Sequence, residues 1–237
     1  MRELIGEAEK LLEKGKTIDS IRLLQQSLKS EEIDRATLGD ACYLLSDAYH
    51  RLGKNEAENA LNYAKEALNI HRSLSEKDSV IDDLINLAHI SADFHGIDEA
   101  KKYIEEAVDE CTNDTQRSIV YLAYGDLLSL TKTGRKMALE LYEKVLSLAG
   151  DNISENYFAA KYGIISTLRD EGKIEESYKL AKEVVDEIGD YCATLSNKKQ
   201  KANLKKSLSY IYDVASDLAM ELNLVNEALE IVKKMKV

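Results

Sequence analysis

Hydrophobic residues recur every three or four positions along nearly the whole chain, and short turn stretches interrupt the runs. One run ends at a glycine, Gly53, and its apolar positions are Cys42, Leu45, Tyr49 and Leu52. The next run has the same spacing at Ala60, Ala64, Ala67 and Leu68. This spacing places the residues on one face of a helix. Glycine suits the end of a helix because it tolerates a left-handed backbone. The pattern therefore predicts two antiparallel helices joined by a short turn.

This unit repeats along the chain with a period near forty residues. The turn positions are Gly15, Gly53, Gly96, Gly134, Gly172 and, with asparagine in place of glycine, Asn223. A small residue follows each turn, at Ser20, Ala60, Ala100, Ala138, Ser177 and Ala228, with spacings of 40, 40, 38, 39 and 51. A fixed period of this length is typical of repeat proteins that stack helix pairs. The long last interval predicts an extended helix or an extra turn, with a joint at 189–203.

Small residues are also expected on the first helix of each pair, because two helices approach closely only where side chains are short. The expected crossing positions are Ala8, Ser46, Ala88, Gly125 and Ser216, while Ile165 departs from the rule in the fifth unit. Each is predicted to face the small residue of the second helix in its own pair.

Composition supports an all-helical protein. Hydrophobic residues make up 44% of the chain and charged residues 32%, while there are only 11 glycines and no proline. A β-sandwich or barrel needs many tight turns, which commonly use glycine and proline. The prediction is an all-α chain: a right-handed superhelical α-solenoid of about six antiparallel helix pairs, forming a single domain over 1–237.

The paired small residues, flanked by Leu, Ile and Tyr, resemble the tetratricopeptide repeat (TPR) family over nearly the whole chain. The period is longer than the usual 34 residues of that family, and the closing proline is absent. The aromatic residue expected early in the first helix is replaced by Leu4, Cys42 and Leu84. The longer period is similar to the repeats of kinesin light chains and of vesicle-fusion attachment proteins. The resemblance implies that first helices line a concave groove that binds a peptide or helix, and it implies no catalysis.

Acidic residues dominate the places expected to face that groove. They are Glu9, Glu13, Asp40, Asp47, Asp82, Asp93, Asp126, Asp170, Asp213, Asp217 and Glu221, against the basic residues Arg2, Arg51 and Arg169. An acidic wall with interspersed tyrosines suits a partner segment with basic or mixed side chains. The alternative is that these acids only solvate the surface.

From this surface we select candidate binding residues of a protein or peptide partner. They are Tyr43, Asp47, His50, Arg51, Asn86, His89, Asp126, Ser129, Tyr162, Arg169, Asp213 and Asp217. The alternatives are a regulatory sensor for a peptide or small molecule, and a phosphopeptide adaptor similar to the 14-3-3 family. The latter needs clustered basic residues in its groove.

The net charge of −11 disfavours nucleic acid and anionic lipid as partners, because phosphate contacts need clustered cations. The dense basic run at Lys198, Lys199, Lys201, Lys205 and Lys206 is interpreted as a solvated joint. No apolar run is long enough to span a membrane, and three widely spaced cysteines do not form a disulfide framework. We therefore expect a cytoplasmic protein.

Sequence motifs for chemistry are missing, so we expect no enzyme and no cofactor. His89, Asp93 and His95 have a spacing that a metal could use, but His95 adjoins a turn glycine and the metal interpretation is not adopted. The final helix carries apolar residues that either turn inward or pair with a second chain as a homodimer: Leu229, Ile231, Val232, Met235 and Val237.

Overall fold

The structure is a computed structural model that describes residues 2–29, 33–150 and 152–236. In these ranges the chain forms thirteen α-helices, one short 3-10 helix and no strand, which confirms the all-α prediction. The helices are α1 (Arg2–Glu13), α2 (Thr17–Ser27), α3 (Arg35–Leu52), α4 (Ala57–Leu74), α5 (Lys77–Phe94), α6 (Ile97–Glu110), α7 (Asp114–Ser129), α8 (Arg135–Ala149), α9 (Glu155–Asp170), α10 (Ile174–Thr194), α11 (Lys198–Ser207), α12 (Ser209–Glu221) and α13 (Val225–Lys236), and the 3-10 helix is η1 (Lys54–Glu56).

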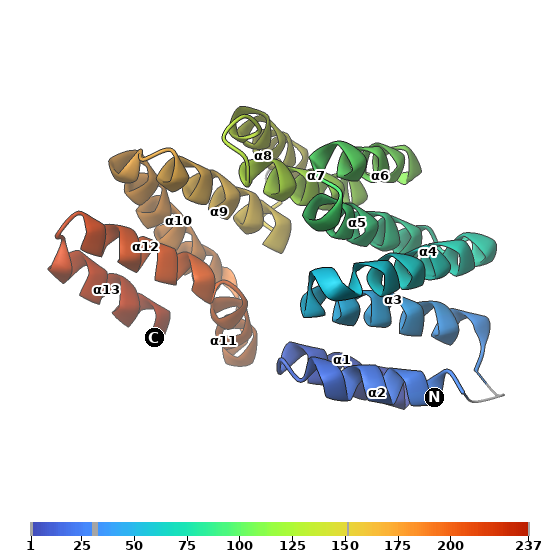
Figure 1. Cartoon of the computed structure of the whole chain (residues 1–237). Coiled ribbons are helices and arrows are strands. Elements are labelled where there is room, and N and C mark those ends of the chain that lie inside the picture. The colour runs from blue at the N-terminus through green and yellow to red at the C-terminus, as the bar shows by residue number, and fades with distance from the viewer. Residues whose placement is uncertain (1, 30–32, 151, 237) are drawn as a thin grey trace. The chain divides into compact units, whose positions relative to one another are not determined.

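Six helix pairs follow one another along the chain, as the period predicts (Figure 1). The pairs are α1 with α2, α3 with α4, α5 with α6, α7 with α8, α9 with α10, and α12 with α13. The chain divides into two compact units, Met1–Val120 and Tyr121–Val237, and each unit has a hydrophobic core of its own. A single domain over 1–237 stays a prediction.

The long interval before the last pair contains both features that the spacing allowed. Helix α10 is extended to 21 residues, and the additional helix α11 follows it before α12 begins. The predicted joint at 189–203 is therefore mostly helical, and the backbone leaves the helix only between Thr194 and Lys198. Asn197 begins α11 by accepting a hydrogen bond from the Lys199 amide, as is common at a helix start.

Five of the six predicted turn residues have a positive φ, as expected for glycine or asparagine at a turn, but Gly134 does not. Its φ is −83°, and it precedes the first residue of α8. A glycine is required there for a different reason, because a Cβ would clash with the carbonyl oxygen of Leu128. Asn223 has a φ of 60° and replaces glycine as predicted.

In the first and fifth pairs, the serine of the second helix meets the first helix at the predicted position and adds a hydrogen bond. The Ser20 hydroxyl on α2 donates to the Ala8 carbonyl oxygen on α1 at 2.8 Å. The Ser177 hydroxyl on α10 donates in the same way to the Ile165 carbonyl oxygen on α9, also at 2.8 Å. The departure at Ile165 thus preserves the contact, since the backbone supplies the acceptor. In α12 the fully buried small residues are Ala215 and Ala219, whereas Ser216 is only half-buried.

Tyr142 is the large side chain at the centre of the packing of α7, α8 and α9. A Cβ added at Gly125 would lie 2.7 Å from its ring atom Cε1, and one added at Gly163 would lie 2.5 Å from the same atom. The Tyr142 hydroxyl donates a hydrogen bond to Asp126 Oδ1 at 2.7 Å. Two glycines therefore make room for one buried ring.

The final helix turns part of its apolar face inward. Ile231 is buried, and Met235 packs against the hydrophobic core formed by α9, α10, α12 and α13. Leu229 is 55% exposed, and Val237 lies outside the described residues. The inward alternative is therefore confirmed for Ile231.

We expect Gly163→Ala to lower the free energy of unfolding by about 1–3 kcal/mol, since overpacking a filled core forces neighbouring groups to move. The matched change Gly189→Ala lies on the exposed face of α10, where a Cβ would meet nothing within 4 Å. It should raise the free energy of unfolding by about 0.5–1 kcal/mol, because alanine favours helix over glycine. Urea unfolding followed by circular dichroism measures both, and equal effects would contradict the role of Tyr142.

Candidate functional site

In the first unit, the predicted binding residues lie on α3 and α5, the first helices of two neighbouring pairs. Arg51 is bound within the protein. Its Nε donates to Asp47 Oδ1 at 3.0 Å, and its Nη1 donates to the Leu12 carbonyl oxygen at 3.1 Å. These contacts join α3 to the end of α1 and leave Arg51 little capacity to grip an anionic partner.

Two further candidates on this face join α3 to α5. His50 Nε2 lies 2.6 Å from Asp93 Oδ2, and its ring packs edge-on against Phe94. The buried amide of Asn86 donates a hydrogen bond to the Ser46 hydroxyl. Both pairs stabilise the packing of neighbouring helix pairs, while Tyr43 and His89 remain half-buried on the same two helices.

In the second unit, the predicted residues lie on α7, α9 and α12. Asp126 accepts the Tyr142 hydrogen bond, and the Ser129 hydroxyl donates to the Asp126 carbonyl oxygen at 2.8 Å. Arg169 donates from Nε to Glu221 Oε1 at 3.0 Å, which joins α9 to α12. Both arginines among the candidate residues are thus paired with carboxylates of their own unit.

Tyrosines and carboxylates remain accessible on α9 and α12. The ring of Tyr162 meets that of Tyr210 edge-on, with centroids 4.7 Å apart. Asp213 and Asp217 are exposed, and neither takes part in an ion pair within the described part of the chain. Tyr210, Asp213 and Asp217 follow one another at three and four residues, so they form one stripe on α12.

A buried pair between α4 and α5 was not predicted. His71 Nδ1 lies 2.6 Å from Asp83 Oδ2, and the two side chains are 2% and 0% exposed. Glycine at position 39 admits the imidazole, since a Cβ there would lie 2.8 Å from His71 Cδ2. His71 Nε2 and Asp83 Oδ1 are buried without a hydrogen-bond partner among the described residues. The sequence signal was faint: Asp83 occupies an apolar-phase position in the run VIDDLINL.

The pair alters the titration of its members. The hydrogen bond to Asp83 raises the pKa of His71 above its usual value, although burial acts in the opposite direction. Burial raises the pKa of Asp83, while the hydrogen bond from His71 opposes that rise. Burial and the neighbouring carboxylates of Asp82 and Asp47 raise the pKa of Tyr43 to about 12, so its hydroxyl stays protonated.

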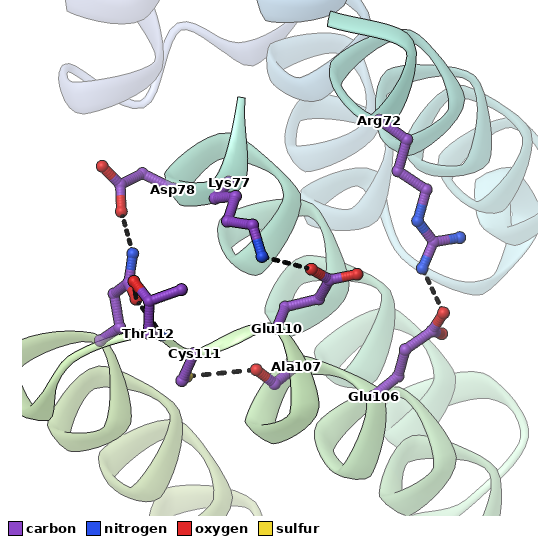
Figure 2. A network of polar contacts seen from close by, with 9 residues as sticks. Arg72, Lys77, Asp78, Glu106, Ala107, Glu110, Cys111 and Thr112 are labelled. Atoms are coloured by element: carbon purple, nitrogen blue, oxygen red, sulfur yellow. Dashed lines mark hydrogen bonds and ion pairs between the residues drawn. The ribbon is translucent and has the colours of Figure 1, made fainter. Parts of the chain in front are cut away.

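Polar and charged side chains of α4, α5, α6 and the start of α7 pair with one another. Figure 2 shows ion pairs from Arg72 to Glu106 and from Lys77 to Glu110, the latter at 3.5 Å. Figure 2 also shows the hydrogen bond to Asp78 Oδ1, which Gln116 Nε2 donates at 2.6 Å. These contacts hold α4, α5, α6 and the start of α7 together.

The lysine run lies on α11 and borders a cavity of about 760 Å³. Lys198, Lys201, Lys205 and Lys206 share its lining with Cys192 and Met235. Lys205 donates to the Lys234 carbonyl oxygen at 2.9 Å, so the run contacts the last helix. Its interpretation as a solvated joint stays a prediction.

Other kinds of site find little support in the described residues. They contain no group of three His, Cys, Asp or Glu side chains able to hold a metal ion, and no helix there has the length and apolarity to cross a bilayer. Cys42, Cys111 and Cys192 are free and buried. Burial raises the pKa of Cys42 to about 12, which leaves its thiol protonated and unreactive.

Among the solved structures that resemble this chain, three cover between 96% and 99% of it. The apo quorum sensor NprR from B. thuringiensis is 18% identical, with a TM-score of 0.60 over 98% of this chain and 74% of its own. Apo RapI is 13% identical, with a TM-score of 0.60 over 99% and 98%. The Rap conjugation gene regulator of plasmid pLS20, in complex with the Phr* peptide, is 17% identical, with a TM-score of 0.60 over 96% and 70%.

The chain has a TPR-like repeat fold. No family model and no curated protein matches the sequence. The resemblance is therefore one of fold.

The buried pair predicts a pH dependence of stability. Folding raises the pKa of His71, so the His71–Asp83 pair contributes to the free energy of unfolding when His71 is protonated. This contribution is fully present below the pKa of the unfolded state, about 6.5, and is lost as pH rises through the pKa of the folded state. Asp83→Asn should lower the pKa of His71, measured by NMR of the imidazole. Each pKa unit corresponds to about 1.4 kcal/mol.

Unfolding with urea between pH 6 and pH 9 tests the same linkage. The difference in unfolding free energy between the unchanged chain and Asp83→Asn should shrink as pH rises. The exposed change Asp98→Asn is the control and should leave the pH profile as it is. An unaltered pKa of His71 in Asp83→Asn would show that the pair is not coupled.

Proposed function

We propose that this TPR-like chain is a non-enzymatic interaction scaffold that binds a protein or peptide segment carrying basic residues. The observation that carries the proposal is the imbalance on the first helices. Arg51 and Arg169 are held by carboxylates of their own unit, whereas Asp213 and Asp217 are exposed without a cationic partner in the described ranges. Such a surface attracts cationic side chains and repels anionic ones.

The tyrosines support a peptide as the ligand. Tyr210 lies on the same stripe of α12 as Asp213 and Asp217, and its ring contacts Tyr162 on α9. Tyrosine supplies rigid contact area with a polar tip and is enriched in protein interfaces. Aromatic area beside unpaired carboxylates suits a segment that alternates apolar and basic side chains.

The second candidate function is a regulatory sensor that responds to a peptide or small molecule. The observation that favours it is the shared fold with a quorum sensor and with a gene regulator bound to a peptide. The two functions use the same surface and differ in whether binding changes the conformation. A phosphopeptide adaptor of the 14-3-3 type is disfavoured, since the candidate residues Arg51 and Arg169 are already paired with carboxylates.

Charge reversal on α12 tests the basic-segment proposal. The variant is Asp213→Lys with Asp217→Lys, because both side chains are exposed. Asp126 is left unchanged, because it accepts a hydrogen bond from buried Tyr142. A library of random peptides displayed on phage should select net-positive peptides. The double variant should weaken their binding by about tenfold or more at low salt, since each reversal replaces an attraction by a repulsion.

The control variant is Glu143→Lys with Glu183→Lys, which makes the same change in net charge on exposed positions of α8 and α10. It should alter affinity less than about twofold, measured by fluorescence anisotropy of a selected peptide. If both variants weaken peptide binding equally, the loss of affinity results from net charge alone and not from the α12 surface. Undiminished binding to the α12 variant would exclude this face as the site.

Self-association through the last helix remains a proposal with a narrower basis. Val225 and Leu229 are exposed four residues apart on α13, so they form a short apolar stripe. If this stripe joins two chains, light scattering after size exclusion should give a dimer mass that Leu229→Glu returns to the monomer. A monomer at high protein concentration would exclude it.

The cytoplasm is the proposed location, in keeping with three free cysteines.

A further inference from the structure

A small cavity in the first unit lies over the buried His71–Asp83 pair. Its volume is about 210 Å³, and it is lined by Asp40 and Tyr43 of α3, His71 of α4, and Ser79, Asp82 and Asp83 of α5. Three of its six lining residues are carboxylates. Asp40 and Asp82 are exposed at the rim, and Asp83 is fully buried.

Two residues that line the cavity, His71 and Asp83, have buried polar atoms that the described part of the protein does not satisfy. Asp83 uses Oδ2 for His71, but its Oδ1 has no hydrogen-bond partner there, and neither has His71 Nε2. Asp40 Oδ1 lies 3.7 Å from Nε2, which is too long for a hydrogen bond. A buried polar atom without a partner destabilises the folded state, so a ligand that provides hydrogen bonds to these atoms would bind favourably.

The charge around the cavity stays negative in either state of His71. With an imidazolium, three carboxylates face one positive charge, and with a neutral ring they face none. The neighbouring cations do not compensate, because Arg72 and Lys77 are paired with Glu106 and Glu110 of α6 (Figure 2). The cavity therefore favours a cation that brings several hydrogen-bond donors.

We propose that this cavity binds a primary alkylammonium group, from a lysine side chain of the partner segment or from a free diamine. An ammonium brings three donors and one positive charge, which matches Asp83 Oδ1 at the floor and Asp40 and Asp82 at the rim. The half-buried Tyr43 ring can contact the methylene stem. A metal ion fits less well, because no three of the acidic or histidine side chains in the described ranges converge as ligands.

The bound ammonium and the protonated His71 imidazolium are both cations beside the same carboxylates, so each disfavours the other. Asp40 faces the imidazole from α3, Asp83 and Asp82 from α5, and Glu76 from the turn before α5, while Arg72 is the neighbouring cation on α4. A bound ammonium therefore lowers the pKa of His71. Affinity should rise as pH increases through that pKa.

The lysine source rests on the proposed function, whereas the diamine source does not. The experiment uses the full chain, with imidazole NMR of its four histidines as the readout. The probes are cadaverine and Nα-acetyl-lysine amide, and Nα-acetyl-norleucine amide is the uncharged control. Both amines should shift His71 saturably and selectively, and the norleucine compound should not. Binding of cadaverine alone would identify a free amine as the source.

Asp40→Asn with Asp82→Asn removes two rim charges at exposed positions, so the fold should be retained, as circular dichroism verifies. This variant should bind either amine about tenfold more weakly or worse, since both rim carboxylates attract the ammonium in the proposed site. The matched control is Asp98→Asn with Asp109→Asn on exposed positions of α6, with a change of less than about twofold.

Three results would overturn the proposal: equal shifts from the norleucine compound, equal weakening in both double variants, or displacement of the amine by micromolar calcium. The outcome is separable from the proposed function. If the selected peptides depend on Asp213 and Asp217 but no amine affects His71, only the proposed amine site is excluded. Amine binding without any selected peptide would remove only the scaffold.

Discussion

The close approach of two helices at a small residue is the contact on which the rest of the structure depends. Ser20, Ala60 and Ala100 are essentially fully buried on the second helices of the first unit. At Ser20 the two helices approach closely, since its hydroxyl reaches the Ala8 carbonyl oxygen, and larger side chains would prevent such an approach. Where the small residue is serine, its hydroxyl must be bonded because a buried hydroxyl without a partner is costly. The carbonyl oxygen twelve residues earlier provides that bond in both the first and the fifth pair.

Packing of this kind divides the surface of each helix into used and unused stripes. One stripe contacts the partner helix, another contacts the neighbouring pair, and the remainder faces outward. In the first unit, the outward charges of α4, α5 and α6 pair with one another. On α12 the outward carboxylates Asp213 and Asp217 have no such partner among the described side chains. The net charge of −11 is thus left accessible on particular faces rather than neutralised evenly.

The His71–Asp83 pair shows that the same packing also encloses polar groups. Replacement of a buried ionic pair by apolar residues is often neutral or stabilising, so such a pair contributes little to stability by itself. Here two of its polar atoms remain unbonded, within the described residues, in the wall of an acidic cavity. A buried titratable pair with perturbed pKa values beside a cavity is a candidate functional position.

The sequence by itself determined the helix pairs, their period and most of their turns. Helical periodicity and a left-handed turn residue are local properties, and so Asn223 could be identified as a substitute for glycine. Local signals also identified the small residues Ser20 and Ser177 at the crossings of the first and fifth pairs, whereas on α12 the predicted Ser216 is half-buried and the adjacent Ala215 is fully buried. The tertiary structure alone decided which polar side chains meet. His50 with Asp93, Asn86 with Ser46, and His71 with Asp83 depend on the rotation of each helix against its neighbours. Only the tertiary structure also explains the glycine at position 134, where a Cβ would clash with Leu128, and shows that α11 follows an extended α10. These features depend on contacts between helices and not on the hydrophobic period within one helix.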